Sequence, residues 1–157
     1  MSLFDIQKIT VGPETLIAQV HLPDDAPLST SDDIEATSRI YQMMPQIANH
    51  TCISEYGDRF RDALGSTSLA HLLEHMTVEL VAQVSDTEVI AGNTREGSEE
   101  RTWEIELTCP DDVLVISALS SANWICGWAF TGGADPAPGL DAIVGGLKSL
   151  LDGLNAS

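Results

Sequence analysis

Alternating apolar and polar residues mark the start of the chain. Residues 4–11 and 15–22 each alternate with a period of two, and Gly12-Pro13 separates them. This period is typical of strands with one buried face, and Gly-Pro favours a turn. We therefore expect a β-hairpin or a pair of adjacent strands, followed by a loop over residues 23–27.

Helical spacing begins after this loop. The run at residues 31–33 is typical of a helix start, because serine and aspartate cap free backbone N–H groups and acidic residues suit a helix N-terminus. The pattern predicts a helix over residues 34–44, which Pro45 ends or bends. A short helix is expected around residues 58–64.

The central segment predicts a longer helix that is mostly buried. Residues 65–67 cap its start, and the pattern continues to about residue 84. Its apolar residues recur at helical spacing, namely Leu69, Leu72, Leu73, Met76 and Leu80.

Two more strands are expected over residues 88–93 and 102–108, joined by a polar loop over 96–100. Residues on one side of a strand recur at every second position. One side of the second strand therefore carries Trp103, Ile105 and Leu107, and the other carries Glu104, Glu106 and Thr108.

The last third of the chain predicts two helices. One starts at residues 110–112 and continues to about 128, and an amphipathic helix follows over 140–154, after a Gly/Pro loop at 132–139. The whole pattern favours an α/β (α+β) fold. It has a roughly four-stranded, mainly antiparallel sheet with helices packed on one face.

Composition supports a single domain over residues 1–157, with 43% apolar residues and no visible repeat. The chain contains no apolar run of membrane-spanning length, and its first residues lack the pattern of a signal peptide. Cys52, Cys109 and Cys126 are widely spaced without a C-x-x-C motif. We expect reduced, mostly buried thiols in a cytoplasmic protein, rather than disulfides or zinc ligands.

The net charge of −17 limits the classes of partner. Phosphate groups would be repelled, so we expect neither nucleic acid nor an anionic membrane to bind. A cationic, arginine-rich substrate is compatible with this charge, although acidity also serves solubility alone. Assembly into a homo-oligomer is compatible with the composition.

The most informative motif is His71-Leu72-Leu73-Glu74-His75, which reads H-x-x-E-H. Histidines four residues apart lie about one turn apart on the same helix face, close enough to share one zinc ion. The glutamate before the second histidine points toward that face, where it is placed to accept a proton from water.

A purely structural polar cluster is the alternative interpretation of this motif. However, the helix is otherwise apolar, and it carries two imidazoles and the carboxylates of Glu74 and Glu79. Burying such groups is costly unless they are paired or bind a metal ion. We therefore favour a metal or catalytic role, with zinc as the first candidate, although manganese and cobalt suit the same ligands.

Three segments resemble the N-terminal domain of cyanophycin synthetase, in the same order and with similar spacing. Residues 44–52 resemble its leucine-proline…glutamate-histidine-x-cysteine segment. Residues 66–80 are similar to its threonine-tryptophan-x-glycine-H-x-x-E-H-x-x-x-E-leucine segment, and residues 92–96 to its glycine-arginine-threonine-arginine-glutamate strand end. Pitrilysin-type inverzincin peptidases share H-x-x-E-H and are a more distant likeness.

The resemblance implies a small zinc-dependent hydrolase that cuts cyanophycin, an isopeptide-linked aspartate-arginine polymer, internally. The sequence departs from the family at Asn93, where the family has arginine, and at Ser68, where it has tryptophan. No ATP-grasp or Mur-ligase-like segment is visible, so we expect a stand-alone hydrolase of a peptide or polypeptide-like substrate. A degenerate metal-containing binding or regulatory module is the alternative.

The resemblance also places Glu79 as the third metal ligand, beside His71 and His75. An ideal helix rises about 12 Å from residue 71 to residue 79, so both side chains reach one ion only near full stretch. Glu106, which projects from a strand, and Glu104 on the same face are the alternatives.

Two further residues receive expected roles. Arg95 is placed to orient a substrate carboxylate or to neutralise an oxyanion, and an ordinary surface ion pair is an equal alternative. His50 is expected in the wall of the site rather than among the ligands.

Overall fold

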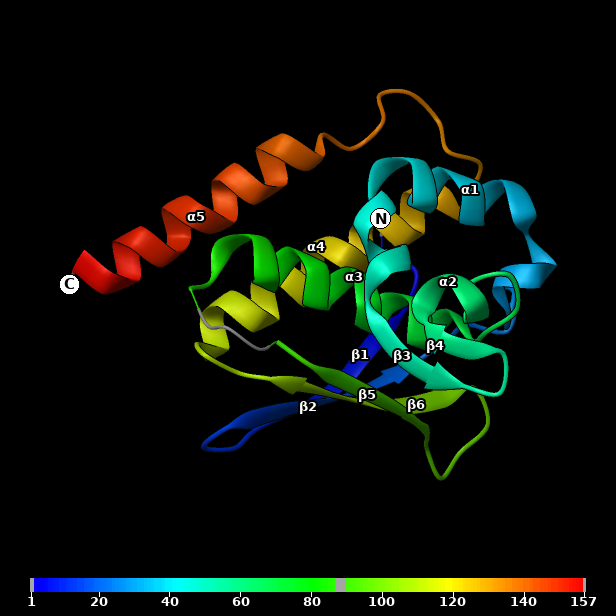
Figure 1. Cartoon of the computed structure of the whole chain (residues 1–157), viewed down its shortest axis with the longest axis horizontal. Helices are drawn as coiled ribbons and strands as arrows, with labels where there is room; N and C mark the ends of the chain where they lie inside the picture. Colours follow the sequence, from blue (N-terminus) through cyan, green and yellow to red (C-terminus); the bar gives the residue numbers. More distant parts are fainter. Residues whose placement is uncertain (1, 87–89, 157) are drawn as a thin grey trace.

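A computed structural model describes residues 2–86 and 90–156. Its main sheet is antiparallel throughout, with the strand order β1-β2-β6-β5 (Figure 1). The four strands are β1 (Asp5–Val11), β2 (Thr15–His21), β5 (Gly92–Glu96) and β6 (Thr102–Thr108). The α/β fold expected from the sequence, with a four-stranded antiparallel sheet, is therefore confirmed.

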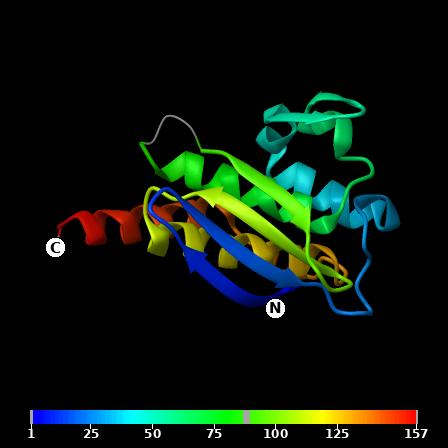
Figure 2. The same cartoon turned by 90° about the horizontal axis from the view of Figure 1, so that it is seen from below.

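The helices pack on one face of this sheet: Figure 1 shows the strands beneath the helices, and Figure 2 looks onto the sheet from the opposite side, with the helices behind it. The long helix α3 (Leu69–Val84) contacts β5, β6, α4 (Asp112–Ala129) and α5 (Leu140–Ala156). The remaining helical segments are η1 (Thr30–Asp32), α1 (Ile34–Met43), η2 (Pro45–Asn49) and α2 (Phe60–Ala63). Among the described helices, none has the length and apolar composition needed to cross a membrane.

The alternation in β6 decides which face carries the core. Trp103, Ile105 and Leu107 are buried, as expected, and Leu16, Ala18 and Val20 of the neighbouring β2 are completely buried beside them. Strand geometry therefore places Glu104 and Glu106 on the opposite face, which the helices do not cover.

The central position of α3 explains why its polar residues are buried. This helix packs against β5 and β6 of the sheet and also against α4 and α5, so little of its circumference faces solvent. Glu74, His75 and Glu79 are each less than 10% exposed. Their burial requires hydrogen-bond partners or a bound ion, because an isolated charge is costly in a low-dielectric interior.

Two local expectations need correction. A short hairpin of β3 (Thr51–Ser54) and β4 (Gly57–Arg59) was not expected, and α2 begins at Phe60, after this hairpin. Strand β5 starts at Gly92 and continues to Glu96, so both the strand and the turn before β6 lie later in the sequence than expected. The Gly97 N–H closes this turn on the Thr102 carbonyl, and residues 88–89 of the expected strand lie outside the described residues.

Candidate metal centre

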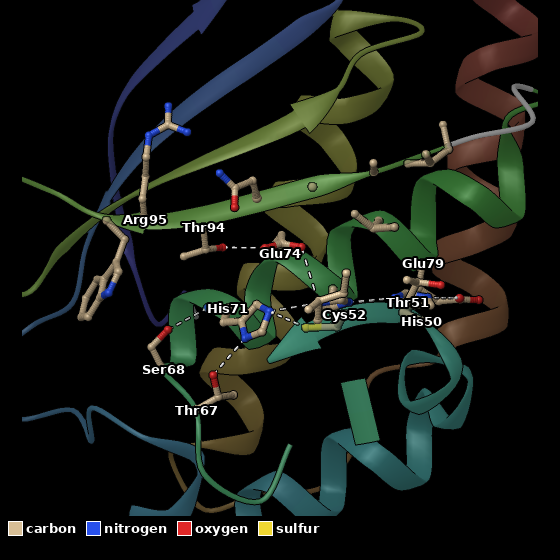
Figure 3. A pocket seen from close by; sticks show the side chains of 18 of the residues that line it. His50, Thr51, Cys52, Thr67, Ser68, His71, Glu74, Glu79, Thr94 and Arg95 are labelled. Carbon is tan, nitrogen blue, oxygen red and sulfur yellow. Dashed lines mark hydrogen bonds and ion pairs between the residues drawn. The ribbon is translucent and has the colours of Figure 1, made fainter. Parts of the chain in front are cut away.

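His71 and His75 lie one turn apart on α3. Their Nε2 atoms are 3.1 Å apart. Figure 3 shows His71 beside Cys52. The Ser68 hydroxyl accepts a hydrogen bond from the His71 N–H. This cap fixes the start of α3 and therefore the position of His71 in its first turn. The helix thus positions the two imidazoles as the H-x-x-E-H spacing indicates.

Cys52 brings a third donor atom from β3. Its Sγ lies 3.4 Å from His71 Nε2, and the donor atoms of Cys52, His71 and His75 all lie within 4.8 Å of one another. An ion bound at the usual zinc distances of about 2.0–2.3 Å requires donors roughly 3–4 Å apart. One thiol and two imidazoles are also ligands that zinc prefers, so these residues fit a zinc ion.

A hydrogen-bonded chain fixes the orientation of His75. The Glu79 carboxylate lies 2.9 Å from His50 Nε2, and His50 Nδ1 lies 3.0 Å from His75 Nδ1. A carboxylate only accepts, so His50 donates from Nε2 and, when neutral, accepts at Nδ1. His75 must then donate from Nδ1, which leaves its Nε2 lone pair directed at His71.

Thr67 orients His71 in a similar way, because its hydroxyl lies 2.9 Å from His71 Nδ1. When Nδ1 donates to this hydroxyl, the Nε2 lone pair of His71 faces that of His75. Two lone pairs at 3.1 Å repel each other unless a proton or a metal ion lies between them. The arrangement is therefore one that a bound cation stabilises.

The environment keeps both imidazoles neutral. Burial lowers the pKa of His75 to about 3, with further contributions from His71 and His50. Burial also lowers the pKa of His71. The Phe60 ring stacks on His75 at 3.9 Å and closes this side of the site with an apolar wall. Neutral imidazole is the form that binds metal ions. At pH 7 neither histidine therefore has to release a proton before it can bind a metal ion.

Glu74 lies beside the three donors without being one of them. Its Oε2 is 3.5 Å from His75 Nε2, and its Oε1 accepts a hydrogen bond of 2.8 Å from the Thr94 hydroxyl on β5. Burial raises the pKa of Glu74, although the Thr94 hydrogen bond and the nearby His50 oppose this effect. A carboxylate with a raised pKa is better suited to take and return protons near neutral pH.

Gly92 makes room for this carboxylate. A Cβ atom built at residue 92 would lie only 2.7 Å from Glu74 Cγ and 2.9 Å from Glu74 Oε2. Strand β5 can therefore pass directly over Glu74 only because residue 92 has no side chain. The same close contact holds Glu74 between the strand and His75.

The site opens into a cavity of about 1000 Å³. The floor is α3, and the walls are β5 and β3, as the close-up in Figure 3 shows. The residues whose polar groups line it include His50, Cys52, Thr67, His71, Glu74, His75, Glu79 and Thr94. The cavity is large enough to admit part of a polypeptide chain next to the three donors.

The structure places the expected third ligands away from the two histidine Nε2 atoms. Glu79 binds His50 and accepts a hydrogen bond from Gln83. Burial alone would raise the pKa of Glu79. The hydrogen bonds with His50 and Gln83 outweigh this effect, so the pKa is lowered. Glu106 and Glu104 lie on the other face of the sheet and do not face the site. The geometry favours Cys52 in their place, contrary to the expectation that this thiol is not a ligand.

Arg95 lies on a strand that lines the cavity, but its guanidinium group points away from the three donor atoms. Its guanidinium donates a 3.2 Å hydrogen bond to Glu106 on the open face of the sheet, because neighbouring strand residues point to opposite faces (Figure 3). The surface ion pair, the alternative interpretation of Arg95, is the arrangement observed. His50 lines the cavity, as expected, and contacts His75 as well.

Cobalt binding distinguishes Cys52 from Glu79 as the third ligand. A thiolate bound to Co²⁺ gives an intense near-ultraviolet charge-transfer band, whereas a carboxylate does not. We expect the cobalt-loaded protein to show this band, Cys52→Ser to lose it, and Glu79→Gln to retain it. Glu79→Gln should still weaken metal affinity about 10–100-fold, because it removes the charged partner that orients His50 and His75.

The two variants serve as controls for each other, since each replaces one side chain by a group of similar size. A band that survives Cys52→Ser, together with loss of metal in Glu79→Gln, would restore Glu79 as the ligand.

A comparison with known protein families shows the family of this chain. The family model described as "Cyanophycin synthase-like N-terminal domain" matches residues 19–127, which include the end of β2, the hairpin, α3, β5 and β6. No curated protein matches the chain. The matched segment covers more than half of the 157 residues and contains Cys52, His71, Glu74 and His75. The chain therefore belongs to the family of cyanophycin synthase-like N-terminal domains.

Proposed function

We propose that this protein is a zinc-dependent hydrolase that cleaves amide bonds in a peptide or in a cyanophycin-like aspartate-arginine polymer. One observation carries the proposal. The donor atoms of Cys52, His71 and His75 converge at the floor of an open cavity, with the Glu74 carboxylate 3.5 Å from His75 Nε2. Three protein donors with a carboxylate beside them are typical of catalytic rather than structural zinc sites.

Each residue has a distinct task in this proposal. Cys52, His71 and His75 hold the ion, which when bound supplies a Lewis acid that polarises a carbonyl group and acidifies water. Glu74 accepts a proton from the attacking water and donates it to the leaving amine. Thr94 and Gly92 keep its carboxylate in place, and Glu79, through His50, keeps the His75 Nε2 unprotonated.

A metal-containing binding module is the second candidate, and the position of Arg95 favours it. A hydrolase benefits from a cationic side chain that stabilises the oxyanion, but Arg95 pairs with Glu106 on the far face of the sheet. Among the residues described as lining the cavity, no other arginine or lysine is present. A binding module would hold the polymer and the metal ion without cleaving.

Hydrolysis of a synthetic aspartate-arginine polymer tests the proposal directly. The zinc-loaded protein should release shorter chains, a chelator should stop the reaction, and added zinc should restore it. Because the protein carries a net charge of −17, the apparent KM should rise with ionic strength, as the Debye length falls to about 10 Å at 0.1 M salt.

A neutral peptide of equal length is the control, and it should be cut poorly at every salt concentration. Intact polymer after prolonged incubation, with zinc bound, would favour the binding module. A preference for acidic or apolar peptides would remove the charge argument and leave a general peptidase.

A further inference from the structure

Strand β5 is the edge of the main sheet and lines the cavity at the same time. It pairs with β6 on one side, and no described strand pairs with it on the other. Five consecutive residues of β5, Gly92–Glu96, line the cavity. An unpaired strand edge is a template for another extended chain, because its free N–H and C=O groups repeat at the spacing of a second strand.

The register identifies which backbone groups are free. Thr108 donates to the Ala91 carbonyl, and Gly97 donates to the Thr102 carbonyl. In an antiparallel pair, hydrogen-bonded residues alternate with residues whose backbone groups point outward. With the regular pairing of β5 and β6, Asn93 and Arg95 therefore bond to β6. The backbone groups of Gly92, Thr94 and Glu96 point away from β6, toward the open edge.

Two of these outward-facing residues, Gly92 and Thr94, contact Glu74. The Thr94 hydroxyl donates to its carboxylate, and the position of a Cβ at Gly92 falls 2.7 Å from Glu74 Cγ. A chain paired with this edge would run along β5 beside Glu74 and the three donor atoms. Its peptide carbonyls would be held at regular intervals next to the group proposed to activate water.

We infer that β5 binds the substrate by strand addition, with the backbone groups of Gly92, Thr94 and Glu96 pairing with an extended polypeptide backbone. The inference rests on the proposed function and specifies its substrate class. The bound molecule must have a backbone with free amide groups that can extend over several residues. Side-chain charge then selects among such chains, whereas the edge of β5 sets their direction across the site.

The expected signature is an alternating pattern of amide protection along β5. The Glu74→Gln variant, loaded with zinc, is mixed with a synthetic aspartate-arginine oligomer that it binds without cleaving. Hydrogen exchange is then followed residue by residue by NMR. The amides of Thr94 and Glu96 should exchange at least tenfold more slowly with the oligomer, whereas those of Asn93 and Arg95, already bonded to β6, should change little.

A proline variant tests the same pairing by affinity. Glu96→Pro removes a backbone N–H that β6 does not use, and proline is tolerated at such edge positions. Glu96→Ala is the matched control, because it removes the same carboxylate but keeps the N–H. Binding of the oligomer, measured by fluorescence anisotropy, should be about fivefold weaker for Glu96→Pro than for Glu96→Ala.

The outcomes separate this inference from the proposed function. Oligomer binding with unchanged exchange at Thr94 and Glu96 would overturn strand addition, whether or not Glu96→Pro folds. The proposed hydrolase would then stand on cleavage by the wild-type protein. If the wild type neither binds nor cleaves the oligomer, the proposed substrate fails, and strand addition of that chain fails with it.

Discussion

Replacement of Glu74 by glutamine is expected to lower the rate of hydrolysis about 10³-fold or more while leaving the fold and bound zinc unchanged. Glutamine keeps the size of the side chain and can still accept the Thr94 hydrogen bond. It cannot take a proton from water, however, so the variant lacks the general base of the proposed mechanism. The measurement is kcat with the aspartate-arginine polymer, together with the zinc content of each protein.

Glu104→Gln is the matched control for this variant. Glu104 lies in β6 on the face of the sheet away from the site, so the same chemical change there should leave kcat within about twofold. Equal turnover by wild type and Glu74→Gln would remove Glu74 from the mechanism. A loss of zinc along with activity would instead show that Glu74 contributes to metal binding.

Replacement of His71 or His75 by alanine is expected to reduce bound zinc from one ion per chain to almost none. Each change removes one of the three donor atoms, and zinc sites with two protein ligands bind far more weakly. Elemental analysis of protein purified without chelator gives the zinc content directly. Circular dichroism shows whether each variant remains folded.

His21→Ala controls for the loss of an imidazole as such. His21 lies at the end of β2, where its ring contacts Asp5 at 3.3 Å, so zinc content should not change. Absence of metal from the wild-type protein would refute the metal centre, as would unchanged zinc in both the His71 and His75 variants.

Periodicity in the sequence predicted most of the fold because the main elements are long and have one buried face. It failed for β3 and β4, which are four and three residues long. Such segments show too few alternations to distinguish a strand from a loop. The start of β5 was misplaced because its residues Gly92–Glu96 are polar and lie at the sheet edge, where burial imposes little alternation.

The candidate site was predictable where it depends on a single helix. His71, Glu74 and His75 are local in sequence, so helical geometry alone brings them together. Cys52 is separated from His71 by nineteen residues, and only the packing of β3 against α3 makes them neighbours. The sequence did contain a signal for Cys52. His50 was expected in the wall of the site, and residues two apart in an extended chain point to the same side, so Cys52 was also a candidate for this wall.

The same geometry explains the position of Glu79. The rise of about 12 Å along the helix from His71 allows one shared ion only near full stretch, and it suits a hydrogen-bonded chain with an imidazole in between. His50 fills this gap, with 2.9 Å to Glu79 and 3.0 Å to His75. In the structure Glu79 therefore contacts His75 through His50, and the sequence alone gave no sign of this intermediate residue.

The position of Cys52 on the hairpin has a consequence for the stability of the protein. Ile53 and Tyr56, in the same hairpin, are 89% and 63% exposed, so apolar burial contributes little to anchoring this segment. An ion held by Cys52, His71 and His75 would act as a removable cross-link between the hairpin and α3. Mass action then makes the anchoring of this cavity wall depend on the free zinc concentration, by about 2.7 kcal/mol at one hundred times the dissociation constant.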